Sequence, residues 1–116
     1  MDNTSNSPSS LSECFDQLDK ILDNSEDMEW FKTSSEDEAV IKSHHGLGGW
    51  IRNNWELWVE ESPLHTYFKK LGLHHADDMS SVILTSYHRK INNKELELDS
   101  QIKEYIEYWD KYGEQD

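Results

Sequence analysis

Apolar residues recur along this chain at the three- and four-residue spacing that is typical of amphipathic helices. The clearest stripes are Leu11, Phe15, Leu18, Ile21 and Leu22 near the start and Ile102, Tyr105, Ile106, Trp109 and Tyr112 near the end. Residues 95–98 alternate as a strand would, but no second segment offers a partner strand. The pattern therefore predicts an all-α fold, a single compact domain of five to seven helices.

Serine residues mark four of the expected helix starts. Ser10 and Ser35 each precede a glutamate by three positions, which is the spacing of a capping box. Ser25 precedes an acidic turn and Ser62 precedes a proline, and both arrangements favour the first turn of a helix. Residues 1–9 are polar and rich in serine and asparagine, so we expect a disordered tail over 1–9 and a single helical domain over 10–113.

Glycines and aspartates indicate further boundaries. Gly72 is expected to end one helix, and the glycines at 46–49 predict a tight bend after the histidine pair that precedes them. The residues from Trp50 to Trp58 fit one helix, and we expect its tryptophans to form core plus one exposed edge. Asp77 or Asp78 is the expected cap of the following long helix.

The formal net charge is −13, and it is unevenly placed. Residues 1–40 carry a net charge of −9, residues 41–95 carry +1, and residues 96–116 carry −5. Such a field repels nucleic acid and anionic membranes, and it attracts a basic protein. The single cysteine, Cys14, and the absence of a basic-then-apolar N-terminal segment predict a cytoplasmic protein.

Two polar segments stand out, at residues 44–58 and 74–92. They combine histidine, arginine and asparagine with tryptophan, which packing alone does not require. We interpret them as a structural polar network, because a buried charged group needs a partner. The expected members are His44, His45, Arg52, Asn53, Asn54, His75, Asp78, His88 and Arg89. In particular, Arg52 is expected to bridge Asp78 or the carbonyl end of a neighbouring helix.

These two segments resemble an uncharacterised family of small bacterial domains. The shared pattern is HHGLGxWIRNNWxLW, then a short helix, then HxxDMSxxILTSYHRxLN, and the matching stretches here begin at His44 and His75. The chain departs from it at Gly49, where a larger residue is expected, and in the acidic stretch at 56–63. The family has no agreed activity, so the resemblance bears on fold more than on function.

Two chemical alternatives remain beside the structural interpretation. Imidazoles and carboxylates that would suit a zinc or iron site are His44, His45, His74, His75, Asp77, Asp78 and His88. His88 could instead act as a base, with Ser80, Ser81 or Ser86 as nucleophile and Arg52 or Arg89 as anion clamp. No pair of histidines has the spacing of a metal-binding helix, and no nucleophile elbow is present. We therefore assign no catalytic residue, no metal ligand and no cofactor.

The leading hypothesis is a small acidic binding protein that neutralises a basic partner, such as an immunity protein against a bacterial toxin, for example a nuclease. The expected partner-binding residues are Asp16, Asp19, Asp23, Glu26, Asp27, Glu29, Trp30, Phe31, Glu36, Asp37 and Glu38. Trp30 and Phe31 are expected to form the apolar centre of the interface. The alternatives are a small enzyme or metal protein and a nucleic-acid mimic, such as a phage-encoded inhibitor.

Overall fold

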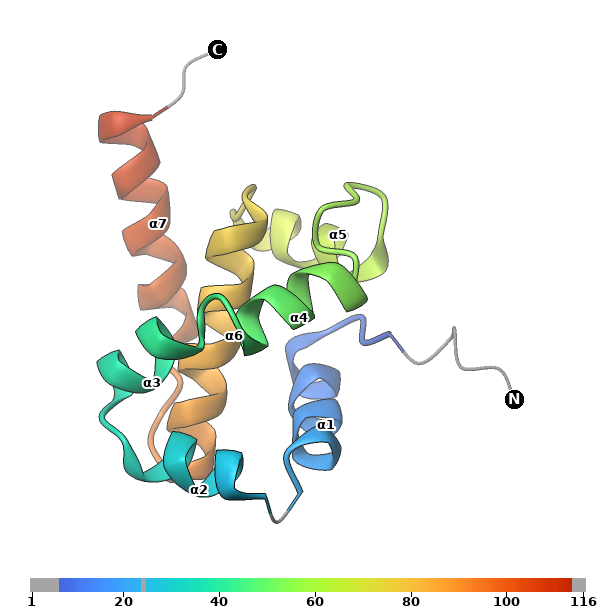
Figure 1. Ribbon diagram of the computed structural model, residues 1–116. Helices are drawn as coiled ribbons and strands as arrows, with labels where there is room; N and C mark the ends of the chain where they lie inside the picture. The colour runs from blue at the N-terminus through green and yellow to red at the C-terminus, as the bar shows by residue number, and fades with distance from the viewer. Residues whose placement is uncertain (1–6, 24, 114–116) are drawn as a thin grey trace.

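The computed structural model describes residues 7–23 and 25–113, and over these residues the chain forms α-helices without a β-strand (Figure 1). The helices are α1 (Leu11–Ile21), α2 (Glu26–Thr33), α3 (Glu36–Ser43), α4 (Leu47–Asn54), α5 (Pro63–Leu71), α6 (Ala76–Ile91) and α7 (Leu98–Tyr112). The predicted all-α, single-domain fold is confirmed. No helix among the described residues combines the length and the apolar character that crossing a membrane requires.

Helix α6 is the centre of the domain, and each of the other six helices packs against it. Its side chains are buried nearly all the way round, and Met79, Val82, Ile83, Leu84 and Tyr87 have no exposed area. A helix that is apolar on every side must lie inside its domain. Helices α1 and α7 lie on opposite sides of α6 in Figure 1.

The predicted serine caps are confirmed. The side chains of Ser10, Ser25, Ser35 and Ser62 each accept a hydrogen bond from the backbone N–H three residues later. These bonds satisfy donors that a helix start leaves without an intrahelical partner. Gly72 also ends α5 as predicted, in a left-handed conformation with φ of 117°.

Three predicted boundaries are wrong. Helix α6 begins at Ala76, so Asp77 and Asp78 lie in its first turn and neither caps it. The helix that contains Trp50 ends at Asn54, because Trp55 turns into the core and the chain then reverses through a positive φ of 55°. The bend predicted at the glycines of residues 46–49 is also misplaced, because α4 begins at Leu47 and includes Gly48 and Gly49.

The structure describes residues 7–9 of the predicted N-terminal tail. Pro8 is buried, and both the backbone N–H and the hydroxyl of Ser9 donate to a carboxylate oxygen of Glu13, at 2.7 and 2.9 Å. Pro8 is therefore packed against the domain, and Ser9 is bonded to the first turn of α1. Residues 1–6 of the predicted tail lie outside the described part of the chain.

Two adjacent glycines in α4 predict opposite effects on stability. A Cβ atom at Gly48 would lie 3.3 Å from the Ser43 carbonyl oxygen and 3.5 Å from Leu84, whereas one at Gly49 would meet only the end of the Arg52 side chain, at 3.7 Å. We expect Gly48→Val to lower the free energy of unfolding by about 1–3 kcal/mol through overpacking. Gly49→Ala should raise it by up to about 1 kcal/mol, because alanine favours the helix. Urea unfolding measures both, and a fully stable Gly48→Val variant would contradict the close packing.

Candidate partner-binding surface

Four of the predicted acidic residues meet in one surface depression. Asp19, Asp23, Glu26 and Glu29 line a depression of about 580 Å³ between α1 and α2, together with Lys32. Below, these four acids are called the acidic depression. Asp19 lies on α1, Glu26 and Glu29 lie on α2, and Asp23 lies between the two helices. The depression therefore brings together four negative charges that lie between positions 19 and 29 of the sequence.

Asp19 is also tied to the core. The hydroxyl of Tyr87, a buried residue of α6, donates a hydrogen bond of 2.8 Å to its carboxylate. Burial, followed by this hydrogen bond, raises the pKa of the Tyr87 phenol, so the hydroxyl remains a donor at neutral pH. Asp19 therefore has a structural function besides its contribution to the surface charge.

The remaining predicted acids are distributed differently. Glu36, Asp37 and Glu38 occupy the first turn of α3, where negative charge favours the helix dipole. Glu36 is engaged by Arg89 on α6, and Glu38 pairs with Lys42 at 3.1 Å. These acids lie outside the depression, as does Asp16. The structure thus separates these acids from the acidic depression, and the one remaining predicted acid, Asp27, lines the groove described next.

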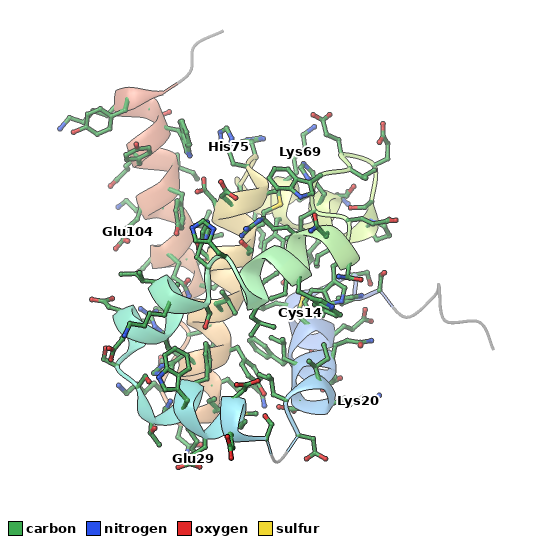
Figure 2. All side chains as sticks on the ribbon, in the orientation of Figure 1. Cys14, Lys20, Glu29, Lys69, His75 and Glu104 are labelled. Atoms are coloured by element: carbon green, nitrogen blue, oxygen red, sulfur yellow. The ribbon has the colours of Figure 1, made fainter. Side chains whose placement is uncertain are left out.

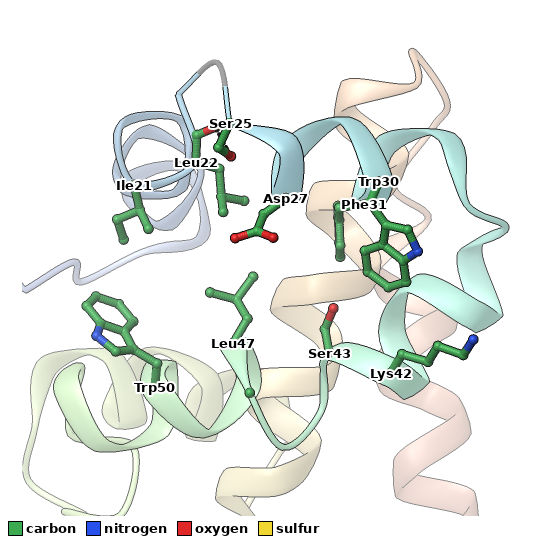
Figure 3. Close-up of a pocket in the computed structure, with 11 residues that line it drawn as sticks. Ile21, Leu22, Ser25, Asp27, Trp30, Phe31, Lys42, Ser43, Leu47 and Trp50 are labelled. Atoms are coloured by element: carbon green, nitrogen blue, oxygen red, sulfur yellow. Dashed lines mark hydrogen bonds between the residues drawn. The ribbon is translucent and has the colours of Figure 1, made fainter.

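An apolar groove lies on the other side of α2 (Figure 3). It has a volume of about 520 Å³ and separates α2 from α4 and the end of α1. Its apolar lining consists of Ile21, Leu22, Trp30, Phe31, Leu47 and Trp50. We call this feature the tryptophan groove, because Trp30 and Trp50 lie along it with 40% and 41% of their surfaces exposed. Ser25 lines both the groove and the acidic depression, so the two are neighbours.

Phe31 is not the exposed anchor that the sequence predicted. Only 2% of its surface is exposed, and its ring packs against Tyr87 and His88 with centroid distances of 6.0 and 5.4 Å. Adjacent helical residues point about 100° apart, so Trp30 can face the groove while Phe31 enters the core. Phe31 contributes the floor of the groove rather than a projecting side chain.

The sequence prediction missed four of the six apolar residues of the groove. Ile21, Leu22 and Leu47 were assigned no partner-binding role, and Trp50 was expected only as part of a tryptophan set that forms core plus one exposed edge. Instead Trp50 is partly exposed, with its ring edge-on to the buried Trp55 at 5.7 Å. The sequence carried one local signal of this exposure. Trp50 lies one residue before the buried Ile51, so the two side chains point in different directions from the helix.

The predicted polar network divides into separate groups. In the first, Arg52 is 8% exposed and its guanidinium donates to the Ser80 hydroxyl at 2.9 Å and to the His44 carbonyl at 3.2 Å. It also lies 3.4 Å from the carboxylate of Asp77. The predicted contact with a helix-end carbonyl is therefore confirmed, but the carboxylate is that of Asp77 and not Asp78. The reason is that α6 begins earlier than predicted, which turns Asp77 toward α4.

The second group joins the start of α6 to α7. The ring of His75, labelled in Figure 2, stacks on Trp109 with a centroid distance of 4.1 Å. The Trp109 indole N–H donates to Asp78 at 2.8 Å. A small cavity of about 250 Å³ lies beside them and is also lined by Tyr105. Burial raises the pKa of the Asp78 carboxyl, although the tryptophan bond opposes this shift.

The third group joins α6 to α3. Arg89 donates to both carboxylate oxygens of Glu36, at 2.8 and 3.1 Å, and to the Leu96 carbonyl at 2.6 Å. The His88 Nε2–H donates to the Ser34 carbonyl at 2.9 Å, because a carbonyl oxygen can only accept. The other ring nitrogen of His88 is buried and has no hydrogen-bond partner among the described residues.

The other predicted network members make local contacts. Asn53 and Asn54 are exposed, the first accepting from the Trp58 indole at 3.2 Å and the second donating to the Trp50 carbonyl at 2.9 Å. His45 is exposed with its ring against His44. These three residues lie on the outer side of α4 and the turn before it, apart from the three groups above.

The residues considered for chemistry are dispersed among these groups. Within residues 7–23 and 25–113, no three His, Cys, Asp or Glu side chains come together as a metal ion would need. The Ser80 hydroxyl is held between Arg52 and the Asp77 carbonyl, and the Ser86 hydroxyl accepts from Gln101 at 3.0 Å. The His88 Nε2 bonds the Ser34 carbonyl and its Nδ1 has no hydrogen-bond partner among the described residues, so neither ring nitrogen bonds either hydroxyl.

Two carboxyl groups predict opposite pH dependence. The Arg89 hydrogen bonds lower the pKa of Glu36 below its ordinary 4.5, whereas burial raises that of Asp78 above 3.8. Glu36 therefore stabilises the fold above pH 4.5 and loses this contribution as the pH falls through its lowered pKa. Ionising Asp78 costs more free energy in the folded protein than in the unfolded chain. Its neutral carboxyl therefore stabilises the fold below pH 3.8, and this contribution is lost as the pH rises through the raised pKa.

We accordingly expect Glu36→Gln to be less stable than the wild type at pH 7, with a difference that shrinks in acid. Asp78→Asn keeps an acceptor for the Trp109 indole N–H and cannot ionise, so this variant should be more stable than the wild type at pH 7. Its advantage should also disappear toward pH 4. Urea unfolding across this range measures both, and a parallel pH dependence of the two variants would contradict these assignments.

The fold and this surface define a small helical domain with an apolar groove beside a concentration of acidic side chains. The chain belongs to the family described as Domain of unknown function (DUF6794), whose model matches residues 7–91. This match confirms the resemblance to an uncharacterised domain family and covers α1 to α6. No curated protein and no solved structure matches the chain.

Proposed function

We propose that this protein binds a basic protein partner and neutralises it, as an immunity protein neutralises a bacterial toxin. The observation that carries the proposal is the tryptophan groove lying directly beside the acidic depression. Apolar side chains ringed by charge form the energetic centre of many protein interfaces. In this proposal the groove supplies affinity and the acidic depression supplies steering.

The charge of the chain narrows the kind of partner. A net charge of −13 speeds encounter with a cationic surface and slows encounter with other acidic proteins. A nuclease toxin must present a positive surface to bind its substrate. An acidic protein that covers that surface would block catalysis without any chemistry of its own. We propose that this takes place in the bacterial cytoplasm.

The proposal is tested with the product of the neighbouring gene, expressed with and without this chain. We expect a toxin whose growth arrest is relieved by the wild-type protein, and a purified complex whose association rate falls steeply between 50 and 500 mM salt. Trp30→Ala should remove protection without changing the melting temperature, because Trp30 is partly exposed in the groove. Growth arrest that persists beside abundant wild-type protein would refute the proposal for that toxin.

A further inference from the structure

Asp27 differs from the other acids of α2 in the direction of its side chain. Glu26 and Glu29 line the acidic depression, whereas Asp27 lines the tryptophan groove on the opposite side of the helix. Figure 3 shows its carboxylate directed into the groove between the apolar side chains of Leu22 and Leu47 on one side and Trp30 on the other. Asp27 is thus a solvent-exposed carboxylate at a groove whose lining is mostly apolar.

Within the described part of the chain, Asp27 takes part in no ion pair and no side-chain hydrogen bond. Lys42 is the cation that lines the same groove, but its ammonium pairs with Glu38 at 3.1 Å. Figure 3 shows that ammonium directed away from Asp27. The charge of Asp27 is therefore available to a ligand that enters the groove.

We propose that the tryptophan groove binds an arginine or lysine side chain of the partner, with the cation at Asp27 and the aliphatic stem between Trp30 and Leu47. Identifying the ligand as part of a partner rests on the proposed function. The preference of the groove for a cation with an apolar stem rests on the geometry alone.

The chemistry of the lining selects this kind of ligand. The stem of an arginine or lysine packs on apolar surface while its head remains with a polar group. The exposed faces of two tryptophans also attract cations. A carboxylate ligand would be repelled by Asp27, and a purely apolar ligand would leave Asp27 facing hydrocarbon without a partner. A groove of about 520 Å³ is also within the usual size range of small-ligand sites.

The test uses the full-length protein and two small probes of similar shape, phenethylguanidinium and phenethyl alcohol. Binding is followed by NMR through the indole N–H signals of Trp30 and Trp50. We expect the wild type to bind the cation more tightly than the alcohol, with both indole signals shifting. Asp27→Asn should weaken binding of the cation about fivefold and leave binding of the alcohol unchanged.

Glu29→Gln is the matched control, because it removes one charge from the same helix on the side of the acidic depression. It should change the affinity for the cation by less than about twofold, and Asp27→Glu should retain the preference. Equal losses in Asp27→Asn and Glu29→Gln would overturn the proposal, because they would indicate a general field. So would an equal affinity of the wild type for the two probes.

These measurements need no partner, so the two proposals can fail separately. A wild-type protein that prefers the cation but does not protect against the toxin would refute the proposed function alone. A protein that protects, but whose Asp27→Asn variant binds both toxin and cation as tightly as the wild type, would refute the assignment of Asp27 alone.

Discussion

Replacing Arg52 with alanine is expected to lower the free energy of unfolding by about 2–4 kcal/mol. The guanidinium is nearly buried and holds three elements together, since it bonds the end of α3 at His44 and the Ser80 hydroxyl of α6 from its own position on α4. Its loss would leave a carbonyl and a hydroxyl without these bonds, and it would also leave a cavity. Chemical unfolding measured by circular dichroism gives the change directly.

Asp77→Asn separates the charge pair from the hydrogen bonds. The side chain of Asp77 is 61% exposed, so solvent screens its attraction to Arg52. We expect this variant to lose less than about 1 kcal/mol. If it loses as much as Arg52→Ala, the ion pair rather than the buried hydrogen bonds must hold α4 on α6.

Reversing Asp23, Glu26 and Glu29 to lysine is expected to slow association with the proposed basic partner by about 100-fold at low salt. The change replaces three negative charges of the acidic depression by three positive ones, directly beside the tryptophan groove. Asp19 is left unchanged, because its bond to Tyr87 would confuse a binding effect with a loss of stability. Stopped-flow association at several salt concentrations measures the rate.

The matched control reverses Glu104, Glu107 and Asp110, which are exposed on α7. It changes the net charge by the same amount at a different place, so it should slow association much less. Equal slowing by the two triple variants would mean that total charge alone steers the encounter. The acidic depression would then have no special function, and the partner surface would have to be sought elsewhere.

Most of the fold could be predicted because its signals are local. A capping serine lies three residues before the N–H from which it accepts, so the sequence itself shows the pair. The glycine that ends α5 can likewise be recognised in the sequence, because glycine readily adopts a positive φ. The start of α6 was wrong because its N-cap, His75, makes no side-chain capping bond while two nearby aspartates imitate a cap. The end of α4 was wrong because burial of Trp55, a tertiary effect, overrides the helical period.

The candidate surface was only partly predictable. Its acids could be named one by one, since charge is a property of each residue. Their division between a depression and a groove depends on which side of α2 each one faces. Trp50 reaches the groove only because α4 and α2 both dock on α6, and no local pattern carries that information. Burial of Phe31 could have been anticipated, because it follows Met28 by three positions on one helical stripe.

The central position of α6 has a consequence for protein synthesis. Helices α1 to α5 contain eight to eleven residues each, which is too short for independent stability in water. They emerge from the ribosome before the helix on which all of them rest. The tryptophan groove, although built entirely from the first fifty residues, therefore does not exist until translation has passed residue 91.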